Sequence, residues 1–277
     1  MDLPVIIATF AFGMFAGSIG TMLGLGGGVL MIIFFIIGLN LPAQQAVALS
    51  LLAVIASSSM GGSVYIRDKM TNLKLAMILE TCTVTGAVIG ALLAMMMPVS
   101  AIQLLLGAVL IYAAATMIKG VREAETPALP VKGLTVKGEY TDECTKMRVC
   151  YTVIRMKLGL FLSLIAGVVS GLVGIGGGVI MVPIMNLAMK IPMKAAAATS
   201  NFMVGVTAAA SAFVYFKQGY VDLYMAVPSV LGIMVGAYAG TLMMGKMRSN
   251  MLRRMLGFIL AFFALVLFMK AAGVLSW

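Results

Sequence analysis

The chain contains no histidine, and only 10% of its 277 residues are charged. Without histidine it lacks the commonest general base, the commonest metal ligand and every catalytic triad that depends on an imidazole. A soluble domain carries charge on about a quarter of its residues, so the low charge content excludes that class. We therefore expect no cofactor and no metal centre. An enzyme would need a carboxylate pair or another nucleophile with its base.

Apolar residues take the place of the missing charge. They make up 62% of the chain, and the mean hydropathy of +1.11 indicates a polytopic helical membrane protein. The first residues, Met1–Pro4, have no basic n-region, so we expect no cleaved signal peptide. The formal charge of +10 suggests nucleic acid as a partner. Basic cytoplasmic loops explain that charge better in so apolar a chain, and the expected partner is the lipid bilayer.

Ten apolar segments follow one another along the chain. A full membrane span needs about 20 residues. The segments at 28–39 and 178–189 are too short, and each directly follows a run of glycines. We interpret each as the second limb of a broken or re-entrant hairpin. The remaining segments lie at about 4–23, 43–66, 75–97, 101–118, 158–173, 195–216, 223–245 and 255–275.

The second half of the chain repeats the first at a constant offset of 150 residues, without a gap. Such a duplication indicates a repeat architecture. We predict an all-α fold of two five-segment halves, 1–119 and 158–277, joined by a linker at 120–157. That count gives about eight full spans plus the two short segments. The paired glycines are Gly24, Gly26, Gly27 and Gly28 in the first half and Gly174, Gly176, Gly177 and Gly178 in the second.

The basic residues predict how the chain crosses the membrane. With five segments per half, 17 of the 19 Lys and Arg lie on one face. If each glycine-broken pair counts as one crossing, the split becomes about 13 to 6, so the positive-inside rule favours five. An odd number of segments inverts the second half. We therefore expect an inverted repeat in the cell (inner) membrane, with a cytoplasmic linker and both termini outside.

The linker is the one hydrophilic insertion. Its prolines and glycines exclude a long helix, and alternating residues at 134–140 and 147–153, on either side of a polar turn from Thr141, predict a small β-hairpin. We expect it to tether the two halves, with regulation as the alternative role. Cys144 and Cys150 lie in it, and a cytoplasmic location favours reduced thiols over a disulfide.

The two glycine runs are where we expect the substrate. A glycine inside a helix costs about 1 kcal/mol relative to alanine, so consecutive glycines should break the helix. Hydrocarbon cannot satisfy the freed backbone groups, and a repeated break of this kind points to a transporter binding site. Neither run has the lysine and hydroxyl of a phosphate loop. A helix that starts after Gly28 or Gly178 nevertheless directs free N–H groups toward the break and favours an anion.

Close helix packing is the alternative explanation for glycine in a membrane helix. The pairs Gly86/Gly90 and Gly236/Gly240 have the four-residue spacing that brings two glycines onto one helix face. We expect these four positions to be helix–helix contacts.

Hydroxyl and amide side chains gather in the third segment of each half. Many such groups only bond the preceding helical turn, but Asn201 is costlier to bury and is the favoured pocket residue. Glu80 is the one carboxylate well inside a span, and such residues are functional candidates by default. It either carries a coupled proton or extends to the membrane interface. Besides the paired glycines, the substrate-binding candidates are Ser50, Ser57, Thr199, Ser200, Asn201 and Thr207.

The doubled glycine pattern resembles the TauE/SafE family of sulfite exporters and related anion transporters. The pattern G-x-G-G-G-x-[LI]-x-x-P lies at 24–33 and 174–183, and Ala198–Asn201 and Tyr215–Asp222 look like later features of the family's half-repeat. The resemblance covers nearly everything except 120–155. It implies movement of sulfite, sulfonates or other small organosulfur anions, usually outward.

Two departures from this pattern make the halves unequal. Ile33 stands where the second half has Pro183, and Leu49-Ser50 stands where it has Thr199-Ser200. We therefore expect the second half to dominate binding.

These observations predict a secondary transporter, in the exporting direction, for a small sulfur-containing anion held between the glycine turns and reached alternately from each side. An anion that leaves a cell gains about 2.3 kcal/mol per charge per 100 mV, so export needs no coupled proton. An anion channel is one alternative, and an intramembrane enzyme is a weaker one. The sequence leaves open whether the chain acts alone or as a homodimer.

Overall fold

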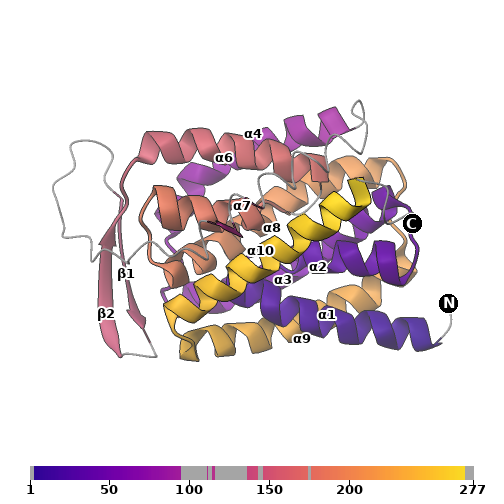
Figure 1. Cartoon of the computed structure of the whole chain (residues 1–277), viewed down its shortest axis with the longest axis horizontal. Coiled ribbons are helices and arrows are strands. Elements are labelled where there is room, and N and C mark those ends of the chain that lie inside the picture. The colour runs from indigo at the N-terminus through magenta and orange to yellow at the C-terminus, as the bar shows by residue number, and fades with distance from the viewer. Residues whose placement is uncertain are drawn as a thin grey trace.

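The structure is a computed structural model that describes residues 3–94, 111, 114–115, 136–142, 146–173 and 176–271. Helices lie side by side through most of it (Figure 1). The first half contains α1 (Leu3–Leu23), α2 (Gly28–Ile33), the π-helix η1 (Phe34–Gly38), α3 (Ala43–Arg67) and α4 (Leu73–Ala94). A hairpin of β1 (Lys137–Asp142) and β2 (Met147–Thr152) follows. The second half contains α6 (Met156–Val173), α7 (Gly178–Pro183), the π-helix η2 (Ile184–Ala188), α8 (Met193–Lys217), α9 (Leu223–Lys246) and α10 (Ser249–Ala271).

Six of the described helices are long and apolar enough to cross a membrane, namely α1, α3, α4, α8, α9 and α10. This confirms a polytopic helical membrane protein. The apolar stretches in α6 and in α7 with η2 are shorter than a span. The predicted segment at 101–118 lies almost wholly outside the described residues, so the total of about eight spans stays a prediction.

The helix boundaries follow the 150-residue offset. The elements α2, η1 and α3 and their counterparts α7, η2 and α8 begin and end 150 residues apart, and α4 and α9 begin 150 residues apart. The short helices start at Gly28 and Gly178, the last glycine of each run, as expected from the cost of consecutive glycines in a helix. Pro42 and Pro192 then precede the first turn of the next long helix, where a missing N–H costs nothing.

The two halves interlock through glycine-lined helix contacts. The helix α1 lies along α9, and the counterpart pair α6 and α4 lies together in the same way. A Cβ atom on Gly236 would overlap the backbone of Met14, and one on Gly86 would overlap the backbone of Leu164. The four-residue glycine spacing therefore permits close backbone approach, which confirms the packing role predicted for both glycine pairs.

The equivalent helices α3 and α8 cross in the middle of the bundle, and more than half of each span is buried. Gly61 of α3 lies against the side chain of Asn201, and Gly205 of α8 lies against Ser58. From Ser58 to Gly61 along α3, the contacts on α8 thus run backwards, from Gly205 to Asn201. The two helices therefore run in opposite directions where they cross.

The linker forms a β-hairpin at one end of the bundle, and the N-terminal end of α1 lies at the opposite end (Figure 1). The strands are antiparallel, with Asp142 opposite Met147. We predicted Thr141 and Asp142 as turn residues, and this was wrong, because both pair within β1 despite their polarity. Tyr140 and Tyr151 are buried, so the hairpin packs firmly against the helices.

Candidate functional site

Both glycine runs form turns that other residues would strain. Left-handed backbone costs a residue with a side chain about 1–2 kcal/mol, and here such positions follow in succession. This confirms that the glycines break the helix. The φ angles are 76° at Gly24, 70° at Gly26, 74° at Gly27, 72° at Gly176 and 82° at Gly177.

The two turns meet at the centre of the bundle. Gly178 lies so close to the first turn that a Cβ atom there would overlap the carbonyl oxygen of Gly24 and lie 3.0 Å from the Cα of Leu25. A Cβ on Gly24 would itself lie 2.5 Å from the carbonyl oxygen of Ala197 in α8. Close approach therefore requires glycine here in addition to the backbone angles. Gly174 lies outside the described residues.

Two of the predicted hydroxyls hold the first turn. Ser57 Oγ donates to the carbonyl of Gly26 at 2.5 Å, and Ser200 Oγ donates to the carbonyl of Gly24 at 2.9 Å. Both serines are fully buried. A hydroxyl has a single proton to donate, so in this conformation these two satisfy backbone carbonyls that hydrocarbon could not.

Three further candidates have other contacts. Ser50 Oγ donates at 2.8 Å to a carbonyl one turn earlier in α3. Thr199 Oγ1 accepts the N–H of Asn72 at 3.1 Å. Thr207 Oγ1 donates to Glu80 Oε1 at 2.7 Å. All three side chains are buried, and none of these three hydrogen bonds involves a glycine turn.

The amide of Asn201 has no such contact. The side chain is fully buried, and neither its oxygen nor its nitrogen has a hydrogen-bond partner among the described residues. The hydroxyl of Thr21, at the end of α1, is equally buried and equally unpaired in that part of the chain. Both side chains lie over Gly61, where a Cβ atom would overlap the methyl carbon of Thr21 and lie 2.6 Å from the Asn201 nitrogen. Each unpaired group costs about 1–3 kcal/mol, and a ligand could offset that cost.

The second turn has a similar group. Ser170 in α6 is fully buried, and its hydroxyl has no partner within the described ranges. A Cβ on Gly177 would lie 3.4 Å from Ser170 Oγ. We predicted neither Thr21 nor Ser170, because we considered only the third segments. The repeat held a signal, since Ser170 corresponds to Gly20 and Thr21 to Gly171, so each hydroxyl lies where the other half has a glycine.

The carboxylate of Glu80 lies in the interior of α4, 6% exposed. Its Oε1 accepts from Thr207, and its Oε2 is buried without a partner among the described residues. The alternative that Glu80 extends to the membrane interface is therefore wrong. A buried carboxylate with one unpaired oxygen has room for a proton.

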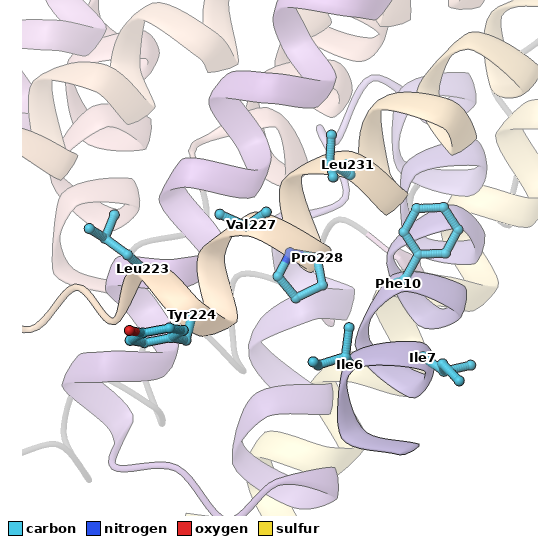
Figure 2. Close-up of a pocket in the computed structure, with 8 residues that line it drawn as sticks. All are labelled: Ile6, Ile7, Phe10, Leu223, Tyr224, Val227, Pro228 and Leu231. Atoms are coloured by element: carbon cyan, nitrogen blue, oxygen red, sulfur yellow. The ribbon is translucent and has the colours of Figure 1, made fainter. Parts of the chain in front are cut away.

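An apolar groove of about 560 Å³ lies elsewhere, between the beginnings of α1 and α9 (Figure 2). An anion would lose its hydration there and gain almost no donor in return, so we do not assign it to the substrate. The groove is lined by Ile6, Ile7, Phe10, Leu223, Tyr224, Val227, Pro228 and Leu231. Within the described residues, no three His, Cys, Asp or Glu side chains lie together as a metal site would need.

Six span-length helices, two buried glycine turns and buried polar groups without partners among the described residues define a polytopic membrane protein with a polar interior. The chain belongs to the sulfite exporter TauE/SafE family, whose sequence model matches residues 9–267. It is therefore a membrane transporter.

Proteins similar to this chain are also named as membrane transporters. The chain is 25% identical over 249 residues to the probable membrane transporter protein YunE of Bacillus subtilis, which covers 86% of this chain and 88% of YunE. A probable membrane transporter protein of Xylella fastidiosa is 24% identical over 269 residues, which cover 94% of this chain and 93% of that protein. The probable membrane transporter protein YdhB of Bacillus subtilis is 22% identical over 236 residues, with 85% and 87% covered. No solved structure matches the chain.

Proposed function

We propose that this protein is a secondary transporter that exports a small sulfur-containing anion, such as sulfite or an organosulfonate. The family's description as sulfite exporters and the names of the relatives support the class. One observation carries the proposal of a site: the side chains of Asn201 and Thr21 both lie over Gly61, and the Asn201 amide and the Thr21 hydroxyl are buried without a partner among the described residues. Several acceptor oxygens on one small anion would satisfy both donors at once.

The substrate is bound at the meeting point of the two glycine turns. The side chains of Thr21 and Asn201 contribute on the side of the first turn, and Ser170 contributes on the side of the second. Ser57 and Ser200 now donate to turn carbonyls. Movement of the first turn would release both hydroxyls, so they join the site when the turn shifts.

Alternating access rests on an inverted repeat. The opposite directions of α3 and α8 at their crossing support this relation. The packing of the halves supports it too. The first helix of each half packs on the fourth α-helix of the other half, α1 on α9 and α6 on α4. Two halves of one design in opposite orientations give a transporter two related conformations, one open to each side.

The hairpin end of the bundle is the cytoplasmic end in this proposal. Asn72 and Lys194 contact the hairpin through hydrogen bonds, and the carbonyl of Gly245 accepts from the same Lys194. Three loops that we predicted to share the basic, cytoplasmic face therefore end near the same hairpin, which supports the assignment. The membrane potential, negative inside, then favours export by about 2.3 kcal/mol per charge per 100 mV.

Substitution of Asn201 tests the site. Alanine removes two buried groups that have no partner among the described residues, so Asn201→Ala should unfold at the same temperature as the wild type or higher. Loss of a hydrogen bond to a charged ligand, about 1.5–3 kcal/mol, should raise the KM for sulfite by about tenfold or more. The measurement is counterflow exchange of labelled sulfite in proteoliposomes, which a channel would not support.

The exposed Asn250 of α10 provides the matched control, since Asn250→Ala should change neither property. If Asn201→Ala lowers the unfolding temperature and leaves the KM unchanged, the amide is structural and the proposed site is wrong.

A further inference from the structure

A buried ion pair connects the hairpin to the helix that carries the proposed site. Lys194, the second residue of α8, is fully buried. Its Nζ donates to Asp142 Oδ1 at 2.7 Å and to the carbonyl of Gly245 at 3.1 Å. The side chain of Asp142, at the end of β1, is only 11% exposed. The hairpin thus supplies the negative charge that this buried ammonium needs.

The fold itself does not require this charge. The corresponding position in α3, 150 residues earlier, is the exposed and uncharged Gln44. The second residue of the equivalent helix therefore has neither burial nor an ion pair. Lys194 and its partner are additions to the second half, and the partner comes from the linker outside the repeat.

Lys194 and Asn201 lie on one face of α8. They are seven residues apart, which is two helical turns or about 10 Å along the axis. Ala197, on the same face between them, contacts the first glycine turn at Gly24. All three α8 residues are fully buried, so this face is closed in the present conformation. It leads from the hairpin directly to the proposed site.

We propose that Lys194 binds the anionic substrate at the hairpin-side entrance, and that the carboxylate of Asp142, which is tethered in β1, competes with the substrate for the Lys194 ammonium. This inference rests on the proposed function. A carboxylate oxygen and a sulfite or sulfonate oxygen form the same charge-assisted hydrogen bond with an ammonium. An arriving anion therefore replaces Asp142, the tip of β1 moves away from α8, and the anion then passes along the α8 face toward Asn201.

Transport kinetics of Asp142→Asn test the competition. Asparagine keeps the size of the side chain and an acceptor for Lys194 but removes the charge. The KM for sulfite on the hairpin side should fall by about tenfold, since the competing charge-assisted bond is lost. The control is Glu139→Gln, in the exposed Arg148–Glu139 pair of the same hairpin, which should leave the KM unchanged. An unchanged KM in Asp142→Asn, with an active wild type, would overturn the inference.

A second measurement does not depend on transport. The double variant Asp142→Asn with Lys194→Gln is neutral at this position, so it avoids an unpaired buried charge. Sulfite should raise the unfolding temperature of Asp142→Asn in detergent more than that of the double variant. Equal shifts would overturn the role of Lys194, whatever the transport result. A wild type that moves neither sulfite nor methanesulfonate would instead contradict the proposed function, and the thermal comparison would still decide the role of Lys194.

Discussion

At the residue scale, buried polar groups divide into those with a partner and those without one. Thr9 donates to a carbonyl one turn earlier at 2.8 Å, the usual arrangement in a membrane helix. Ser57 and Ser200 instead reach the first glycine turn from α3 and α8. Asn201 has neither kind of contact among the described residues. An unpaired buried amide has an energetic cost, and ligand binding explains why that cost is tolerated.

Glu80 also has an oxygen, Oε2, that is buried without a partner among the described residues. Glutamine keeps the size of the side chain and an acceptor for Thr207, but it cannot take up or release a proton. If Glu80 carries a coupled proton, Glu80→Gln should lose accumulation of sulfite driven by a pH gradient. Counterflow exchange should remain, because exchange needs no net proton movement. Both rates are measured in the same proteoliposomes.

Glu139 serves as the control for this experiment. It is an exposed glutamate of the hairpin, so Glu139→Gln should keep accumulation driven by the pH gradient. Full accumulation in Glu80→Gln would exclude Glu80 as the proton carrier.

At the element scale, local signals predicted most of the structure. Consecutive glycines set the start of both short helices, and the 150-residue offset carried these boundaries from one half to the other. The hairpin followed from alternation, although Thr141 and Asp142 belong to the strand. These features depend on residues close together in the sequence, which is why a single sequence was enough.

The contacts of the site could not be predicted in the same way. The partner of Ser200 lies 176 residues earlier and that of Ser57 lies 31 residues earlier. Which hydroxyl meets a turn carbonyl, and which stays unpaired, depends on how α3 crosses α8. The burial of Lys194 likewise depends on the hairpin folding back over α8.

The glycine turns allow backbone strain to be separated from crowding. In Gly177→Ala the new methyl group would meet Ser170 at an ordinary 3.4 Å, so only the φ of 82° opposes it. The loss of stability should be about 1–2 kcal/mol. In Gly24→Ala the methyl group would also lie 2.5 Å from the carbonyl oxygen of Ala197, which adds about 1–3 kcal/mol.

Thermal unfolding in detergent measures both variants. Gly177→Ala should fold with a modestly lower unfolding temperature, and Gly24→Ala should lose clearly more or fail to fold. Equal losses would mean that the first glycine turn does not pack against α8 as closely as the contact between Gly24 and Ala197 indicates.

At the scale of the whole molecule, each half completes the packing of the other. The first helix of one half packs along the fourth α-helix of the other half on both sides of the bundle, α1 on α9 and α6 on α4. The glycines at these contacts leave little freedom for α1 to separate from α9 or α6 from α4. We therefore expect each mixed pair to move as one body during transport, around the crossing of α3 and α8.

The proposed orientation can be tested with the hairpin's own cysteine. Cys150 is exposed on β2, at the end of the bundle that we assign to the cytoplasm. A variant that keeps Cys150 and replaces Cys82 and Cys144 with alanine should react with a membrane-impermeant maleimide only after the cells are permeabilised. The opposite end provides the contrast, since Lys217 ends α8 about 35 Å from its start at the hairpin. Lys217→Cys, in a chain without other cysteines, should react in intact cells. Labelling of Cys150 in intact cells would show that the orientation is the reverse of the one proposed. The membrane potential would then oppose the movement of an anion from the hairpin end to the opposite end.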